Sequence, residues 1–258
     1  MKKRLIVTIM LGQDPSFEFV KRAFKGYAKK VNADFLCITE PSLILNNNNN
    51  KLFFAALFQK ISLGNLSDIY ERVLYLDADI LITPHAKNIF DHYHDKTKIY
   101  MLNEGLTCNR KKELELISQA LGASIRDLNY FNSGVILFPK NNQFLKAIRI
   151  HDLEFFVKNS NWFDQTYINF KVRLNSLKTE NMDKEFNKMG NLEDFGKRFL
   201  ASFIHYSGNG YCPKKHRPVM ILKDYCYLYN YVPTLKEQII FRIQYINFRF
   251  LRILNKFL

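Results

Sequence analysis

The chain has 258 residues, of which 47% are hydrophobic and 15% aromatic, and it carries a net charge of +14. A chain this rich in apolar residues excludes intrinsic disorder and a coiled-coil rod as the main state. Its length fits one large domain or two small ones. The basic excess leaves three kinds of partner open, which are nucleic acid, an anionic membrane and a phosphate-bearing substrate.

The cysteines are scattered along the chain and form no C-x-x-C pair. This spacing excludes a zinc knuckle, a thioredoxin-like site and a disulfide scaffold, and it fits a reducing cytosol. The four residues are Cys37, Cys108, Cys212 and Cys226.

Three basic residues open the chain before the apolar run 5–11, so the N-terminus superficially looks like a signal peptide. The run is short, Gln13 and Asp14 follow it at once, and no small-x-small cleavage site is present. We therefore predict a buried first strand. No stretch of about 20 apolar residues occurs, so no membrane-spanning helix is expected.

Strand and helix patterns alternate along the chain, and this alternation predicts an α/β fold with a mainly parallel sheet. The near-continuous apolar run 72–83 is typical of a strand buried on both faces. We predict one domain over residues 1–232 and a helical tail over 233–258. Predicted strands cover 5–11, 34–39, 72–83, 98–102, 134–138 and 199–206, predicted helices cover 16–30 (capped by Ser16), 51–63, 142–158 and 164–174, and the five asparagines 46–50 form a loop.

The sharpest motif is R-V-L-Y-L-D-A-D-I-L-I over residues 72–82, which places Asp77 and Asp79 at the end of a buried strand. A regular strand would aim both carboxylates to one side, and a turn would splay them around a shared point. Two like charges in this position are costly unless a positive charge lies between them. Because carboxylate oxygens suit magnesium and manganese, we predict a divalent cation here. The structural alternative is that Asp77 caps a turn and Asp79 is solvated.

Three further runs place polar residues beside apolar elements, and each also has an ordinary structural explanation. Asn132 and Ser133 open a predicted strand, where they suit a hydroxyl-rich ligand or simply form a turn. Asp164 and Gln165 begin a predicted helix, where Asp164 could be only an N-cap. His205 closes an apolar strand, and a lone histidine is more often structural than a ligand.

Together, the content and order of these four motifs resemble the family-8 retaining glycosyltransferases of the GT-A fold. That family includes bacterial lipopolysaccharide galactosyltransferases and glycogenin. The resemblance covers about residues 3–216 and implies a Rossmann-like, mostly parallel sheet flanked by helices. It also implies transfer of a hexose from a uridine-diphosphate sugar to a glycan or glycolipid, with retention of configuration, in bacterial surface polysaccharide or lipopolysaccharide synthesis.

The resemblance assigns roles residue by residue. In the family, the D-x-D motif binds manganese together with the histidine of a later H-x-x-G motif. An F-N-[AS]-G strand contacts the donor sugar, a D-Q pair lies beneath it, and a basic residue before the D-x-D strand also contacts the donor. The implied residues are Asp77, Asp79 and His205 for Mn²⁺ (or Mg²⁺), Asn132, Ser133, Gly208 and Lys60 for the donor, and Asp164 and Gln165 for catalysis.

Two parts of the family pattern are altered. The family continues H-x-x-G-x-x-K-P-W, whereas this chain reads H-Y-S-G-N-G-Y-C-P-K-K from His205. The lysine expected at the diphosphate is therefore displaced, and Lys214 is the predicted residue with Lys215 as a rival. The family's acidic pair near the nucleotide base is also changed, and Asp14 is its match.

The chemistry of glycosyl transfer explains why these residue types are needed. Breaking the anomeric bond builds positive charge on the sugar and negative charge on the diphosphate. A divalent ion and lysines stabilise the diphosphate, and a carboxylate or amide stabilises the positive centre. Because the Gln165 amide is a poor nucleophile, we favour attack by the acceptor from the leaving-group side, with the leaving phosphate helping to take the acceptor's proton.

The segment 236–258 has the pattern of a basic amphipathic helix. Central arginines cost about 2.5–3.5 kcal/mol each inside a bilayer, whereas each basic residue contributes about 1 kcal/mol on an anionic surface. We therefore predict binding to an anionic membrane surface, the alternative being packing on its own domain or on a second subunit. The apolar stripe is Ile239, Ile243, Ile246, Phe250, Ile253 and Phe257, with Arg242, Arg249, Arg252 and Lys256 beside it.

Half of the excess charge lies near the C-terminus, because residues 211–258 hold nine basic and two acidic residues. This concentration differs from the diffuse charge of a nucleic-acid-binding protein, so no nucleic-acid partner is expected. It predicts a cytoplasmic catalytic domain held at the inner face of the cell membrane, close to its acceptor.

Two rival functions remain open from the residues. A haloacid-dehalogenase-like phosphatase also places a D-x-D motif after a buried strand, although it favours threonine or valine where this chain has Leu81. A non-enzymatic nucleic-acid-binding module fits the charge, although no helix-turn-helix, RNP-like motif or zinc spacing supports it.

Overall fold

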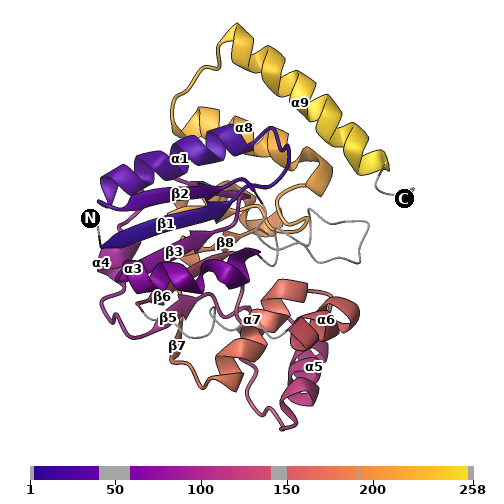
Figure 1. The fold of residues 1–258 in the computed structure, drawn as a ribbon. Helices are drawn as coiled ribbons and strands as arrows, with labels where there is room; N and C mark the ends of the chain where they lie inside the picture. Colours follow the sequence, from indigo (N-terminus) through magenta and orange to yellow (C-terminus); the bar gives the residue numbers. More distant parts are fainter. Residues whose placement is uncertain (1–2, 41–58, 141–149, 191, 255–258) are drawn as a thin grey trace.

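The computed structural model describes residues 3–40, 59–140, 150–190 and 192–254 (Figure 1). Its centre is a six-stranded sheet in the order β2-β1-β3-β6-β5-β7, in which β6 runs antiparallel to its two neighbours and the other pairings are parallel. The prediction of a mostly parallel α/β sheet is confirmed. The strands are β1 (Arg4–Ile9), β2 (Asp34–Ile38), β3 (Arg72–Leu76), β5 (Ile99–Met101), β6 (Val135–Pro139) and β7 (Thr179–Asn181).

Helices flank this sheet. In Figure 1, α1, α8 and α9 lie at one end of the molecule, and α5, α6 and α7 form a group at the other. The α-helices are α1 (Phe17–Lys30), α3 (Leu66–Ile69), α4 (Ile89–His92), α5 (Lys111–Leu121), α6 (Ile150–Asn159), α7 (Phe163–Leu174), α8 (Arg217–Leu228) and α9 (Leu235–Leu254). Short 3-10 helices are η1 (Lys60–Asn65), η2 (Glu104–Leu106), η3 (Lys184–Phe186), η4 (Leu192–Leu200) and η5 (Lys214–His216).

The central strands are mostly apolar because the sheet is buried on both faces. In β1, Leu5 and Val7 pack into one hydrophobic core, and Ile6 packs into another on the opposite face. The same alternation occurs in β3, where Val73 and Leu74 point to opposite cores. A strand with two buried faces cannot show alternation of polar and apolar residues, which is why its sequence is a continuous apolar run.

The predicted strand 72–83 is wrong in its second half, since β3 ends at Leu76. Residues 77–79 form a turn, in which the Ile80 N–H donates to the Asp77 carbonyl at 3.2 Å. The chain then enters β4 (Ile80–Ile82), part of a second sheet ordered β4-β9-β8, with β8 (Lys188–Met189) and β9 (Phe203–His205). Apolar residues continue on both sides of the turn, so the pattern hides the break between the two sheets.

Other predicted boundaries also need correction. The predicted strand 199–206 is confined to β9, because residues up to Leu200 belong to the 3-10 helix η4. Ser16 occupies the N-cap position of α1 but makes no side-chain cap, and its hydroxyl contacts Asp14 instead. Helices α5 and α8 were absent from the predicted elements.

Parts of two predicted helices and one predicted loop lie outside the described residues. Of the predicted helix 51–63, only the end from residue 59 is described, and from Lys60 it is the 3-10 helix η1. Of the predicted helix 142–158, the described part begins at Ile150 as α6. The asparagine run 46–50 is entirely outside.

The predicted tail helix is present as α9, and it contacts α1 and η5 through one face. Phe241 is buried, and its ring centroid lies 6.2 Å from that of Phe19 in α1. The predicted stripe faces away from this contact, with Ile243, Ile246 and Phe250 between 55% and 66% exposed. The stripe in this described part therefore does not pack on its own domain. Among the described residues, no helix combines the length and apolarity needed to cross a membrane.

Candidate active site

A cavity of about 430 Å³ takes its walls from the ends of β1 and β3, from β9 and from the start of α7. It brings together every residue that was predicted for the site. These are Asp14, Lys60, Asp77, Asp79, Asn132, Ser133, Asp164, Gln165, His205, Gly208 and Lys214. The rival Lys215 does not line the cavity.

The three predicted metal ligands lie in one group, because the turn after β3 faces the end of β9. The Nε2 atom of His205 is 3.3 Å from Oδ1 of Asp79 and 4.0 Å from Oδ2 of Asp77. One atom from each residue lies within 4.8 Å of the other two. This separation is compatible with one ion contacting all three atoms.

In each aspartate, the carboxylate oxygen that does not face His205 binds a cationic side chain of the protein. Lys60 Nζ lies 3.2 Å from Oδ1 of Asp77, and the Tyr75 hydroxyl donates to the same oxygen at 2.5 Å. Arg217 donates to Oδ2 of Asp79 at 2.6 Å. These contacts fix both carboxylates so that their other oxygens point toward His205.

A chain of hydrogen bonds determines which nitrogen of His205 carries the proton. The Gly134 N–H donates to Asn132, which identifies the acceptor as Oδ1, and Asn187 Nδ2 donates to that same oxygen. The other amide atom of Asn187 is therefore Oδ1, which lies 2.8 Å from Nδ1 of His205 and accepts its proton. When the ring is neutral, as metal binding requires, Nε2 consequently presents a lone pair to the two carboxylates.

Three electron-rich atoms at this spacing repel one another unless a cation lies between them. Burial by itself would raise the pKa of Asp79, but the Arg217 cation, together with the His205 ring when it is protonated, outweighs it and holds that pKa below its usual range. Asp79 is therefore ionised at neutral pH. Two carboxylates and a neutral imidazole fit Mn²⁺ or Mg²⁺, which accept oxygen ligands readily.

Lys60 is buried between the metal group and Asp164. Its Nζ lies 2.6 Å from Oδ2 of Asp164 and 3.2 Å from the Ser133 hydroxyl, and 5.1 Å from the centre of the Tyr75 ring. Burial alone would lower the pKa of Lys60, but Asp164 and Asp77 raise it above its usual range. Lys60 therefore stays charged and links the two acidic groups.

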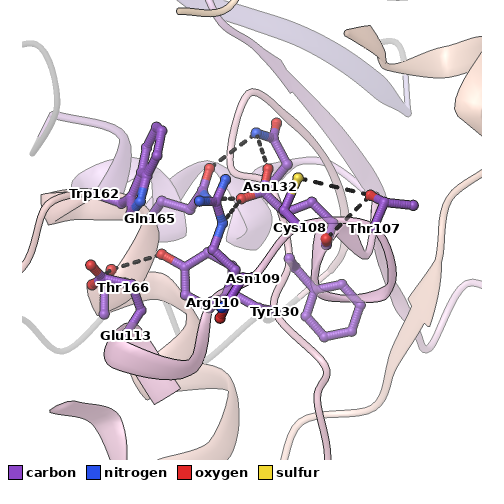
Figure 2. A network of polar contacts seen from close by, with 12 residues as sticks. Thr107, Cys108, Asn109, Arg110, Glu113, Tyr130, Asn132, Trp162, Gln165 and Thr166 are labelled. Atoms are coloured by element: carbon purple, nitrogen blue, oxygen red, sulfur yellow. Dashed lines mark hydrogen bonds and ion pairs between the residues drawn. The ribbon is translucent and has the colours of Figure 1, made fainter. Parts of the chain in front are cut away.

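Gln165 is held at both ends of its amide (Figure 2). Its Oε1 accepts from the Ser133 N–H at 3.1 Å and from Asn132 Nδ2 at 3.0 Å. Its Nε2 donates to Oε1 of Glu104 at 2.8 Å. The Glu104 carboxylate is buried and also accepts from Arg110 at 2.6 Å, which balances its charge. The amide is therefore fixed in one orientation.

Comparison with known proteins agrees with this geometry. The family model described as glycosyl transferase family 8 matches residues 16–211. The chain belongs to glycosyl transferase family 8. The protein is thus a glycosyltransferase, and the phosphatase alternative is wrong. No curated protein matches the chain.

Solved glycosyltransferases share the fold of this one at low sequence identity. One is a glycosyltransferase involved in the glycosylation of the major capsid of PBCV-1, with 15% identity and a TM-score of 0.53, covering 85% of this chain and 98% of that chain. Another is the galactosyltransferase LgtC in complex with donor and acceptor sugar analogs, with 14% identity and a TM-score of 0.51, covering 89% and 97%. These similarities establish the GT-A fold.

The sequence patterns did not predict three residues of this glycosyltransferase's site. Arg217 lines the cavity and binds Asp79, and it precedes Pro218, so the basic-proline pair of the family pattern is present but displaced. That dipeptide could have identified it. Asn187 and Glu104 lie in segments without a recognisable pattern, and nothing in the sequence marks them.

The loop after β9 carries the remaining basic groups of the glycosyltransferase site. Gly208 has φ of +57°, a left-handed conformation that glycine adopts without strain. Its carbonyl accepts from Arg217 at 3.2 Å, and the Lys214 N–H donates to Asn209 at 3.1 Å. The loop thereby holds Arg217 and Lys214 at the same cavity as the metal group.

Proposed function

We propose that this glycosyltransferase transfers a hexose from a nucleotide sugar to a glycan or glycolipid, with retention of configuration and with Mn²⁺ or Mg²⁺ as cofactor. The observation that carries the proposal is the convergence of the metal-facing atoms of Asp77, Asp79 and His205 at a cavity that also presents basic and amide groups.

The diphosphate of the donor binds to the basic loop and the metal group. A bound divalent ion would neutralise the charge that develops on the leaving diphosphate. Lys214 and Arg217 add positive charge from the protein. Among the described residues, Nε of Arg217 is a buried donor without a hydrogen-bond partner, so a phosphate oxygen that reached it after a shift of the side chain would satisfy it.

The nucleoside end of the donor lies at the β1 side of the cavity. Ile9, Leu11 and Phe17 line this side together with Asp14. The Asp14 Oδ1 atom accepts from the Ser16 N–H at 2.8 Å. Burial raises the pKa of Asp14 despite this hydrogen bond. An apolar wall with one acidic group suits uracil and its ribose.

The donor sugar lies over Asp164 and Gln165. Because Oε1 of Gln165 already accepts two hydrogen bonds from Asn132 and Ser133, it is a weak nucleophile. Asp164 is engaged by Lys60 in the same way. These contacts support attack by the acceptor from the leaving-group side, with the departing phosphate accepting the proton of the acceptor hydroxyl.

The helix α9 binds an anionic membrane surface. Its apolar stripe points away from the face that contacts α1, so the stripe is free to enter a lipid headgroup layer. Lys236, Arg242 and Arg249 lie on this helix near the stripe, where they meet anionic headgroups. The glycosyltransferase then works at the inner face of the cell membrane, on an acceptor of bacterial surface polysaccharide or lipopolysaccharide.

The test is an assay of UDP release with a panel of UDP-hexoses in Mn²⁺, in Mg²⁺ and in EDTA. Release is expected from one UDP-hexose in the presence of a divalent ion and is lost in EDTA. Asp79→Asn should abolish it, and Lys215→Ala, outside the cavity, should not. The product's anomeric configuration, read by NMR, tests retention. Metal-independent release, or release unaffected by Asp79→Asn, would contradict the proposal.

A further inference from the structure

We propose that Trp162 is the platform on which a pyranose ring of the acceptor stacks, an inference that rests on the function proposed above. Trp162 is the one tryptophan of the chain. It lines the cavity next to Asp164 and Gln165, yet 42% of its surface is exposed. A large ring left open at a polar cavity is suited to a ligand with an apolar face. Pyranose rings have such a face, because hydroxyl groups in equatorial positions leave C–H groups to cover a face of the ring.

The indole of Trp162 is held in place by Arg110 (Figure 2). The guanidinium carbon of Arg110 lies 4.3 Å from the centre of the indole ring. Arg110 is itself fixed by its ion pair of 2.6 Å with Glu104, whose side chain is only 3% exposed. One face of the indole is therefore covered by a fixed cation, and we place the stacked ring on the opposite face, since 42% of the residue is exposed and it lines the cavity.

The backbone at Trp162 is also held by a buried acid. The Glu113 carboxylate accepts from the Ser160 hydroxyl at 2.6 Å and from the Asn161 N–H at 3.1 Å. The Ser160 Oγ atom in turn accepts from the Trp162 N–H at 2.9 Å. Phe163 follows with φ of +34°, an unusual value for a residue other than glycine. Such conformations persist where the surroundings hold them, often at ligand sites.

The position of Trp162 favours the acceptor over the donor. The charged part of the donor is drawn to Arg217 and the metal group, and its sugar lies over Asp164 and Gln165, which are about nine-tenths buried or more. Trp162 is the exposed neighbour of this buried pair. A second substrate that approaches an already bound donor therefore meets Trp162 before it reaches the floor of the cavity.

The single tryptophan makes this inference measurable in the unmodified protein. Acrylamide quenching of Trp162 fluorescence is recorded with UDP and Mg²⁺, and then with methyl glycosides of glucose, galactose and N-acetylglucosamine, and with lactose. We expect at least one glycoside to lower the quenching constant by about twofold, since stacking covers the open face of the ring. UDP and Mg²⁺ alone should leave the constant unchanged. Protection by UDP alone, or by none of the glycosides, would overturn the platform.

A second experiment compares the KM values of Trp162 variants for the acceptor and for the nucleotide sugar. Trp162→Ala should raise the acceptor KM about tenfold, because the loss of an aromatic stack weakens binding by about that factor. The KM for the nucleotide sugar should not change, and Trp162→Phe should keep most of the acceptor affinity. The control is Tyr227→Ala, another exposed aromatic residue, which lies in α8 outside the cavity. An equal rise in both KM values would overturn the platform.

Calorimetric titration of UDP into the same protein separates the two proposals. Binding of UDP without protection of Trp162 by any glycoside overturns the platform alone. Failure to bind UDP in the presence of Mg²⁺ or Mn²⁺ overturns the proposed function. The fluorescence measurement needs no variant, so it remains decisive even if Trp162→Ala fails to fold.

Discussion

The Nδ1–H group of His205 donates a hydrogen bond to Oδ1 of Asn187 across 2.8 Å, and this contact turns Nε2 toward Asp77 and Asp79. A histidine that binds a metal ion needs its second nitrogen fixed in this way, because the tautomer and the ring orientation are otherwise free to change. Asn187 is thus a positioning residue for the metal group although it does not face the ion itself.

Asn187→Ala should weaken Mn²⁺ binding by about 10- to 100-fold, the usual effect of removing an outer partner of a metal-binding histidine. The measurement is a calorimetric titration of Mn²⁺ into the protein. Asn187→Asp keeps an acceptor for Nδ1 and should restore part of the affinity. Asn175→Ala, an exposed asparagine at the end of α7, is the control. Equal affinity in Asn187→Ala and wild type would show that Asn187 does not position His205.

Arg217→Ala should reduce the affinity for UDP by about 10- to 100-fold, because hydrogen bonds to charged groups contribute about 1.5–3 kcal/mol. Arg217→Lys keeps the charge but loses the two-nitrogen contact with Asp79 and Gly208, so it should recover only part of the loss. Calorimetry with UDP in Mg²⁺ measures the effect, and Lys215→Ala is the matched control. If Arg217→Ala binds UDP as tightly as wild type does, Arg217 does not bind the diphosphate.

Lys60→Met should destabilise the protein by about 3–5 kcal/mol, since it leaves Asp77 and Asp164 without their shared buried cation. Chemical denaturation in EDTA measures the free energy of unfolding without a contribution from metal. The double variant Lys60→Met/Asp164→Asn also removes the Asp164 charge that Lys60 no longer balances. It should recover much of the lost free energy of unfolding. If the single variant is as stable as wild type, the ammonium does not compensate these carboxylates.

Acid should loosen the contact of α9 with the rest of the molecule. The Tyr231 hydroxyl, the Thr234 N–H and Arg22 lower the pKa of Glu237 from 4.5 to about 2. Because its pKa is lower in the folded state, the stabilisation is complete above pH 4.5 and is lost as the pH falls toward 2. Limited proteolysis of α9 should therefore speed up between pH 4.5 and 2.

The variant Glu237→Gln provides the control for this pH effect. It removes the titrating group, so α9 should be cut faster than in wild type at pH 6 and should show little further change on acidification. A wild-type protein whose α9 resists proteolysis equally at pH 6 and pH 2.5 would contradict the role of Glu237.

The exposed stripe of α9 should decide membrane binding. The triple variant Ile243→Ser, Ile246→Ser and Phe250→Ser should lose sedimentation with phosphatidylglycerol vesicles, because the apolar face that enters the headgroup layer is gone. Wild-type binding should weaken on phosphatidylcholine vesicles and at high salt, since the basic residues need anionic headgroups.

The control for this experiment is Gln244→Ser with Asn247→Ser, which changes exposed polar positions of the same helix. Unchanged sedimentation of the triple variant would contradict the membrane proposal. A concentration-dependent dimer of the wild type that is absent in the triple variant would instead assign the stripe to a second copy of the chain.

The sequence alone indicated eleven of the residues that line the cavity, although it did not indicate Arg217. Asp77 and Asp79 follow an apolar strand, and Asp164 and Gln165 begin a helix, so each motif lies at the boundary of an element. Residue type and position at an element boundary are local properties, and they survive in a linear pattern. All eleven predicted residues consequently line one cavity.

Only the tertiary structure decided how the charges in this cavity are used. Arg217 reaches Asp79 across 138 positions, and Asn187 lies 18 positions from His205 in a segment without periodicity. Contacts between distant segments depend on how two sheets meet at the turn after β3, and a continuous apolar run conceals that turn. The sequence therefore determined which groups surround the substrate, whereas packing determined which oxygen of each aspartate faces His205.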